Sequence, residues 1–135
     1  MRSLVAIVAL CVLSLFGSHA DASAVRINLN KANQAAGPVK YSLQTSTNHG
    51  IVNVRLELPR KQTPLDYLWR IDIVMRKDDK TLLAVPLDTK LDGGNLVGDL
   101  LVNPIAMANT EIWIRTGEHA PLAETIYAID LGSFK

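Results

Sequence analysis

Apolar and polar residues alternate one by one along most of the chain that follows residue 38. Between Ile51 and Leu58, every second residue is valine or leucine, and polar residues such as Arg55 and Glu57 stand between them. This period of two places alternate side chains on the two faces of an extended strand. After residue 20 the sequence has no apolar stripe of helical period with a capping residue at its start. The pattern therefore predicts an all-β protein.

Turn residues divide the alternating segments. The turns are predicted at Asn48–Gly50, Lys77–Lys80, Gly93–Gly94 and Gly117–Pro121, and Pro86 indicates an edge strand or a strand end. The predicted strands are Val39–Ser46, Ile51–Leu58, Tyr67–Met75, Thr81–Leu87, one that begins near Leu96, Glu111–Thr116 and Thr125–Leu131. About seven short strands in roughly 100 residues are typical of an antiparallel β-sandwich of the immunoglobulin-like kind. A small β-barrel is the alternative.

The strand predicted over Tyr67–Met75 carries one of the two tryptophans of the chain. Alternation places Trp69 on the same face as Ile71, which predicts that its side chain packs in the core. Asp72 shares the opposite face with arginine residues, and cross-strand ion pairs explain such a face without catalysis.

Residues 1–20 have the pattern of a secretory signal peptide. Arg2 precedes an uncharged apolar run, Leu4–Phe16, and small residues stand three and one before a cut after Ala20. The run is shorter than the about 20 apolar residues that a membrane-spanning helix needs. Cuts after Ala22 or Ala24 are alternatives. We therefore expect a signal peptide (1–20), a polar leader with a possible first strand at Ala24–Leu29 (21–38), and a single β-sandwich domain (39–135).

Cleavage of residues 1–20 changes the charge and the cysteine content of the chain. Cys11, the only cysteine, is removed, so the mature chain has no thiol for a disulfide or a metal. Loss of Arg2 leaves 13 basic side chains against 13 acidic ones. A neutral chain lacks the positive surface of a nucleic-acid-binding protein and the polybasic segment of a membrane-associated one. The sequence predicts a secreted or periplasmic protein with no nucleic-acid partner and, after cleavage, no membrane span.

Two groups of residues are candidate metal ligands. A cut after Ser18 would make His19 the first residue, and its amine and imidazole would bind Cu²⁺ together with His49 or His119. The favoured cut after Ala20 discards His19. The second group surrounds a glycine turn and offers oxygen ligands for Ca²⁺; it consists of Asp88, Asp92 and Asn95. Its spacing matches no defined calcium loop, and these residue types also suit an ordinary turn. We therefore expect no cofactor, with Cu²⁺ or Ca²⁺ as alternatives.

Trp113 and Arg115 are the candidate binding residues. Ile112 and Ile114 alternate with them, so a core position for the isoleucines places Trp113 and Arg115 on the opposite face. Exposed tryptophan and arginine are common anchors of binding surfaces. The alternative is that Trp113 packs beneath a loop, or that both faces are partly buried.

The sequence has none of the common catalytic motifs: no G-x-S-x-G, no phosphate-binding glycine loop and no H-E-x-x-H. We expect a non-catalytic binding or interaction module that acts through loops or an edge strand. Its expected partner is a protein or a cell-envelope component. A metal-binding (copper or calcium) secreted sandwich protein and a carbohydrate-binding module are the alternatives.

Overall fold

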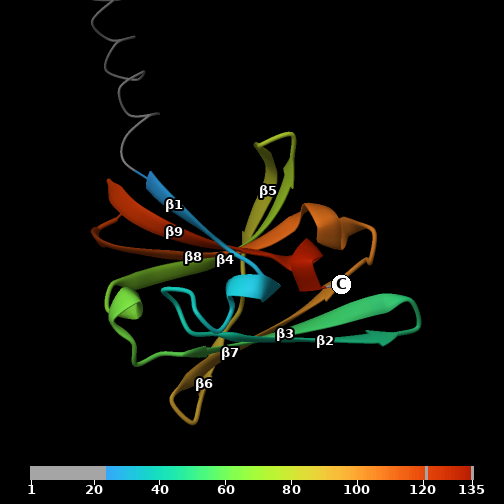
Figure 1. Cartoon of the computed structure of the whole chain (residues 1–135), viewed down its shortest axis with the longest axis horizontal. Helices are drawn as coiled ribbons and strands as arrows, with labels where there is room; N and C mark the ends of the chain where they lie inside the picture. Colours follow the sequence, from blue (N-terminus) through green and yellow to red (C-terminus); the bar gives the residue numbers. More distant parts are fainter. Residues whose placement is uncertain (1–23, 121, 135) are drawn as a thin grey trace, which may run out of the picture.

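The protein is a two-layer β-sandwich in a computed structural model that describes residues 24–120 and 122–134. Sheet A has the strand order β1-β9-β8-β4-β5, and sheet B the order β2-β3-β7-β6 (Figure 1). The strands are β1 (Ala24–Leu29), β2 (Ser42–Asn48), β3 (Ile51–Pro59), β4 (Leu68–Lys77), β5 (Lys80–Pro86), β6 (Lys90–Asp92), β7 (Asn95–Val102), β8 (Thr110–His119) and β9 (Ala123–Asp130). Three short 3₁₀ helices lie in connections between strands of the described residues: η1 (Lys31–Asn33), η2 (Thr63–Leu65) and η3 (Ala106–Asn109). A further one, η4 (Leu131–Phe134), follows β9.

The predicted all-β sandwich is confirmed, and the barrel alternative is wrong because the two sheets are not closed on each other. The described residues form nine strands rather than about seven, because β1 joins sheet A and the short β6 pairs with β7. No helix within the described residues is long and apolar enough to cross a membrane. The predicted signal peptide, Cys11 and His19 lie outside the described residues.

The core lies between the two sheets, where alternation predicts it. In β3, Val52, Val54, Leu56 and Leu58 are all buried, and the residues between them lie on the other face. Ile112 and Ile114 of β8 are likewise buried in the same core. Apolar burial on the inner faces of the central strands is the main force that holds the two sheets together.

Three tight hairpins connect β2 to β3, β4 to β5 and β6 to β7. Each has two central residues with positive φ: His49 and Gly50, Asp78 and Asp79, and Gly93 and Gly94. Two such residues make a turn whose twist matches that of the strands, and aspartate and glycine are favoured there. The turn conformation therefore accounts for the polar and glycine residues at these three positions.

One strand pair departs from the antiparallel expectation. β1 pairs in parallel with β9, from Ala24 opposite Glu124 to Leu29 opposite Ile129. The chain leaves β1 through η1 and crosses to sheet B, so no hairpin constrains the direction of β1. This pairing brings Arg26 to the edge of sheet A.

The core position predicted for Trp69 is wrong, since its side chain is 41% exposed. The register of β4 against β8 shifts between Leu68 and Arg70, which is a β-bulge at Trp69. An extra residue in one strand reverses the alternation on one side of the bulge. Leu68 consequently packs against the core, and the indole of Trp69 lies under the guanidinium of Arg115 instead.

The core tyrosine Tyr41 makes stability depend on pH. Burial raises the pKa of Tyr41 from 10.0 to about 12, and its hydroxyl donates to the carbonyl of Asn30 over 3.2 Å. The unfolded chain loses the phenol proton near pH 10, whereas the folded chain keeps it to about pH 12. The contribution of Tyr41 to stability is therefore fully present below pH 10 and is lost as the pH rises to about 12. We expect a loss of about 2 kcal/mol in urea denaturation between about pH 9 and pH 12. Tyr41→Phe should lose less over this range; an equal loss would contradict the assignment.

Candidate functional site

The outer face of sheet A, which points away from the core, carries most of the strong polar contacts. Trp113 in the middle of β8 lies opposite Asp72 of β4 on one side and Ala128 of β9 on the other. Two clusters of side chains surround these three cross-strand neighbours. The Trp113 cluster consists of Trp113, Glu111, Arg26 and Arg76; the Asp72 cluster consists of Asp72, Arg70, Arg115, Glu124 and Trp69.

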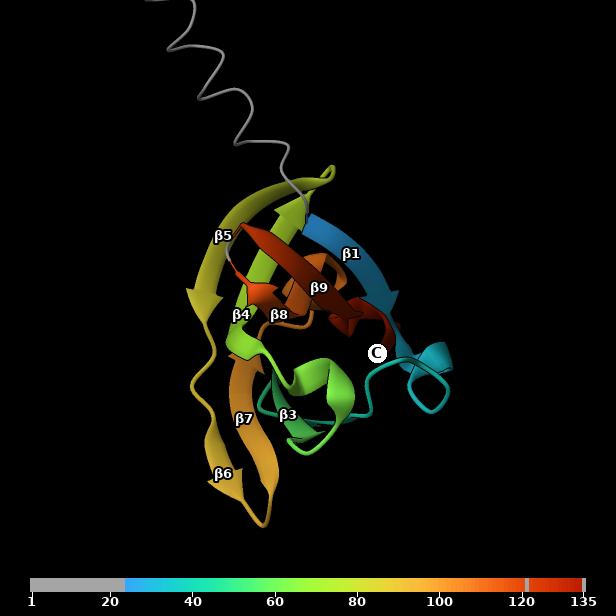
Figure 2. The same cartoon turned by 90° about the vertical axis from the view of Figure 1, so that its left-hand side faces the viewer.

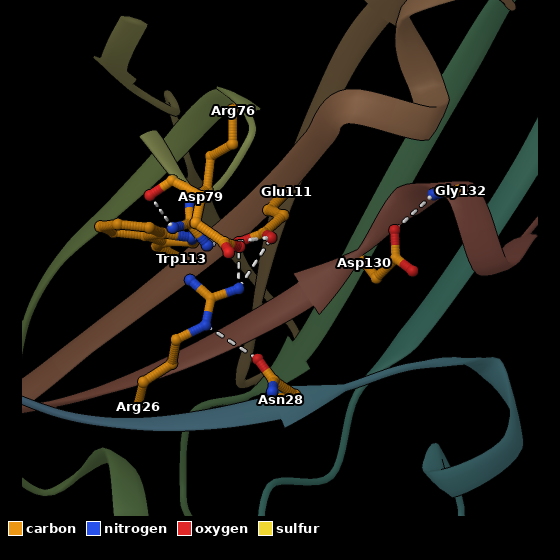
Figure 3. A network of polar contacts seen from close by, with 8 residues as sticks. All are labelled: Arg26, Asn28, Arg76, Asp79, Glu111, Trp113, Asp130 and Gly132. Atoms are coloured by element: carbon orange, nitrogen blue, oxygen red, sulfur yellow. Dashed lines mark hydrogen bonds and ion pairs between the residues drawn. The ribbon is translucent and has the colours of Figure 1, made fainter. Parts of the chain in front are cut away.

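In the Trp113 cluster, two arginines and one carboxylate hold the indole (Figure 3). The guanidinium carbons of Arg26 and Arg76 lie 5.5 and 5.9 Å from the ring centroid. The indole N–H donates to Oε2 of Glu111 over 2.6 Å, and Nη2 of Arg26 donates to both Glu111 oxygens over 2.7 Å. A cation over a tryptophan ring is attracted by the charge distribution of the ring. Trp113 is thereby half-buried and held on several sides by its own chain.

In the Asp72 cluster, a fully buried carboxylate accepts hydrogen bonds from two arginines. Nε of Arg70 donates to Asp72 over 2.6 Å, and Nη1 of Arg115 donates to it over 3.1 Å. Arg115 also donates to both oxygens of Glu124, over 3.1 and 2.8 Å. The hydrogen bond to Glu124 raises the pKa of Arg115 most; burial opposes this, and Asp72 adds to it. Arg115 is therefore the cation that links two largely buried acids.

The two clusters cover an apolar layer on the outer side of sheet A. Val74, Ile126 and Ala128 are buried although they do not belong to the core between the sheets. The methylene stems of long arginine side chains can cover apolar surface while the charged ends remain in contact with water. Trp113 and Arg115 thus lie on the predicted face, opposite Ile112 and Ile114, and both are engaged by neighbouring side chains.

The candidate metal ligands lie in separate parts of the fold. His49 is in the β2–β3 turn of sheet B, and His119 is the last residue of β8 in sheet A. The β2–β3 turn and the β8–β9 connection lie at opposite sides of the molecule in Figure 1. His49 lines an open depression of about 540 Å³ with Asn48, Asn53 and Asp99. Within the described ranges, no three histidine, cysteine or acidic side chains gather closely enough to hold a metal ion.

The predicted calcium ligands flank two connections rather than a closed loop. Asp92 and Asn95 pair across the Gly93–Gly94 turn, and Asp88 lies in the connection between β5 and β6. Asp88 and Asp92 are exposed. Both turn positions have positive φ angles, and this requirement explains why glycine occupies them.

The edge strand β5 is the second unusual surface. It is the last strand of sheet A, as the proline at its end indicates, and all seven of its residues are exposed. Leu82, Leu83 and Val85 are 64%, 51% and 38% exposed. Alternation predicts that Leu83 and Val85 share the core-facing side, but it cannot indicate that the β4–β5 hairpin projects away from sheet B (Figure 1). Exposure of this apolar strand is the feature that sequence reasoning missed.

Comparison with known proteins found no protein-family model, no curated protein and no solved structure that matches the chain.

Proposed function

We propose that the protein is an exported, non-catalytic binding module that holds an extended segment of a partner protein along β5. One observation supports this most directly: β5 is an exposed edge strand rich in apolar residues. Natural proteins usually shorten, charge or cover such an edge, because its free N–H and C=O groups pair with other chains. An edge that is left apolar is consistent with a binding role.

The position of β5 makes the edge accessible. Figure 2 shows the chain running from β5 along one side of the molecule into β6, and β5 pairs with no strand other than β4 in the described part of the chain. Charged and proline residues stand only at its ends, as Lys80 and Pro86. The five residues between them are uncharged, which leaves room for a short added strand.

The chemistry of β5 favours a polypeptide with small or branched apolar side chains. An added strand would pair with β5 through main-chain hydrogen bonds, while side chains on one face contact its neighbours. On that face Leu83 lies opposite Met75 and Val85 lies opposite Ile73, and none of the four carries a charge. An uncharged, alternating apolar segment therefore fits this edge better than a charged one.

Site-specific photo-cross-linking in the producing organism tests the proposal. A photoreactive residue in place of Leu82 should form an adduct with an extended segment of one protein. The same residue in place of Leu101, which is 73% exposed on sheet B, is the matched control and should form none. The mapped segment, made as a peptide, should bind the purified protein and slow the hydrogen exchange of the β5 amides. Leu83→Lys should weaken this binding by about tenfold or more.

Three outcomes would refute strand addition by a partner. Equal adducts from both positions would indicate non-specific contact. An adduct with a second copy of this chain would make β5 a dimer interface. Peptide binding without protection of the β5 amides would place the partner elsewhere, for example on the face that carries Trp113 and Arg115.

A further inference from the structure

A cavity of about 360 Å³ opens where β4 begins and β5 ends. Its wall combines both sheets: Trp69 and Arg70 come from β4, and Leu96 comes from β7. Leu87 and Thr89, in the connection between β5 and β6, close another side. The main-chain N–H of Leu87 donates to the carbonyl of Ile71 over 2.9 Å, which holds this connection against β4. The cavity is in the size range of small-ligand sites.

The cavity contains one arginine whose charge has no acidic partner. Arg60 follows β3, and its main-chain N–H donates to the carbonyl of Gly94 over 3.1 Å. Its guanidinium donates to the carbonyl of Leu65 and forms no ion pair within the described residues. Arg70, on the same wall, is already paired with Asp72. The net positive charge of the cavity therefore comes from Arg60, whose guanidinium has five donor hydrogens and uses one of them on Leu65.

The apolar part of the cavity wall is formed by Trp69 and its aliphatic neighbours. The bulge in β4 turns Trp69 away from the core, and its partly exposed indole lines the cavity beside Leu68 and Pro86. Arg115 lies over the ring at 4.9 Å from its centroid. A flat indole surface binds the carbon skeleton of a ligand, whereas an unpaired guanidinium binds an anion, best a planar carboxylate.

We propose that this cavity binds a small organic carboxylate, whose carboxylate group is held by Arg60 and whose carbon skeleton lies against Trp69. Two sources offer this chemistry: the C-terminal residue of a peptide and an acidic sugar. Carboxylate binding at the start of β4 does not require strand addition at β5.

Titration of the wild-type protein by NMR tests the proposal. The chain has two tryptophans, so two indole N–H signals are expected, and Trp69→Phe assigns the signal of Trp69. N-acetyl-leucine and N-acetyl-leucinamide form one matched pair, and glucuronate and glucose form another. In at least one pair, the carboxylate should move the Trp69 signal and bind about tenfold more tightly than its neutral partner, which corresponds to about 1.4 kcal/mol. The preferred pair identifies the source.

Two variants separate the role of Arg60 from a general change of charge. Arg60→Gln should abolish the preference for the carboxylate, while Lys61→Gln, an exposed neighbour with the same loss of charge, should keep it. The unchanged Trp113 signal shows that each variant is folded, and Arg60→Lys, which keeps the charge, should retain part of the preference. Equal binding of acid and neutral ligands, no binding of any of the four, or equal effects of Arg60→Gln and Lys61→Gln would overturn the proposal. None of these results bears on the cross-linking at β5.

Discussion

Replacement of Arg115 by methionine should lower the free energy of unfolding by about 3 kcal/mol. The substitution keeps most of the side-chain volume but leaves Glu124 without its cation and Asp72 with Arg70 only. Side chains of Asp72 and Glu124 are only 1% and 8% exposed. A carboxylate held away from water without its cation is costly. Urea denaturation near neutral pH measures the loss.

Arg55→Met is the control for this prediction. Arg55 also contacts two acids, Glu57 and Asp99, but all three side chains lie on the exposed surface of sheet B, and the distances are 3.3 and 3.4 Å. Exposed ion pairs contribute little, so we expect a loss below about 1 kcal/mol. Equal costs for the two variants would refute the role assigned to Arg115.

Trp113→Ala should also cost about 3 kcal/mol, because the ring packs over buried residues as well as interacting with charged ones. Arg26 and Arg76 would lose the ring beneath them, and Glu111 would lose the donor at 2.6 Å. The apolar layer formed by Val74 and its neighbours would lose part of its cover. Thermal and urea denaturation measure this change.

The other tryptophan provides the matched control. Trp69 is 41% exposed and contacts one arginine, so Trp69→Ala should cost about 1 kcal/mol. Binding of the partner segment at β5 should be retained in Trp113→Ala under conditions where that variant is folded. A loss for Trp113→Ala no greater than that for Trp69→Ala would show that Trp113 is presented for binding rather than packed. Loss of capture by a folded Trp113→Ala variant would place the binding site on the outer face of sheet A.

Much of the fold is predictable because its signals are local. Alternation along β3 and β8 identifies the residues that face the core, since the period of two follows from strand geometry itself. The turn at Lys77–Lys80 is equally local, because Asp78 and Asp79 adopt the positive φ angles that a two-residue hairpin requires. Pro86 at the end of β5 marks the edge of a sheet through its missing N–H.

The candidate sites are much less predictable, because they depend on residues far apart in the chain. The contact between Arg26 and Glu111 joins residues 85 positions apart, and it exists because β1 pairs in parallel with β9. The cavity near Trp69 depends on a bulge, which alternation alone does not reveal. Exposure of Leu83 depends on how far sheet B extends beneath the β4–β5 hairpin.

The sequence by itself determines most of the segments of this protein that form strands, where most turns fall and which face is apolar along a strand without a bulge. These properties follow from the geometry of short stretches of backbone. The tertiary structure alone decides the neighbours of each strand, and with them the partners of Asp72, the exposure of β5 and the unpaired charge of Arg60. Strand order sets which side chains meet and which remain open to water, and pairing across long separations leaves no periodic signal in the chain.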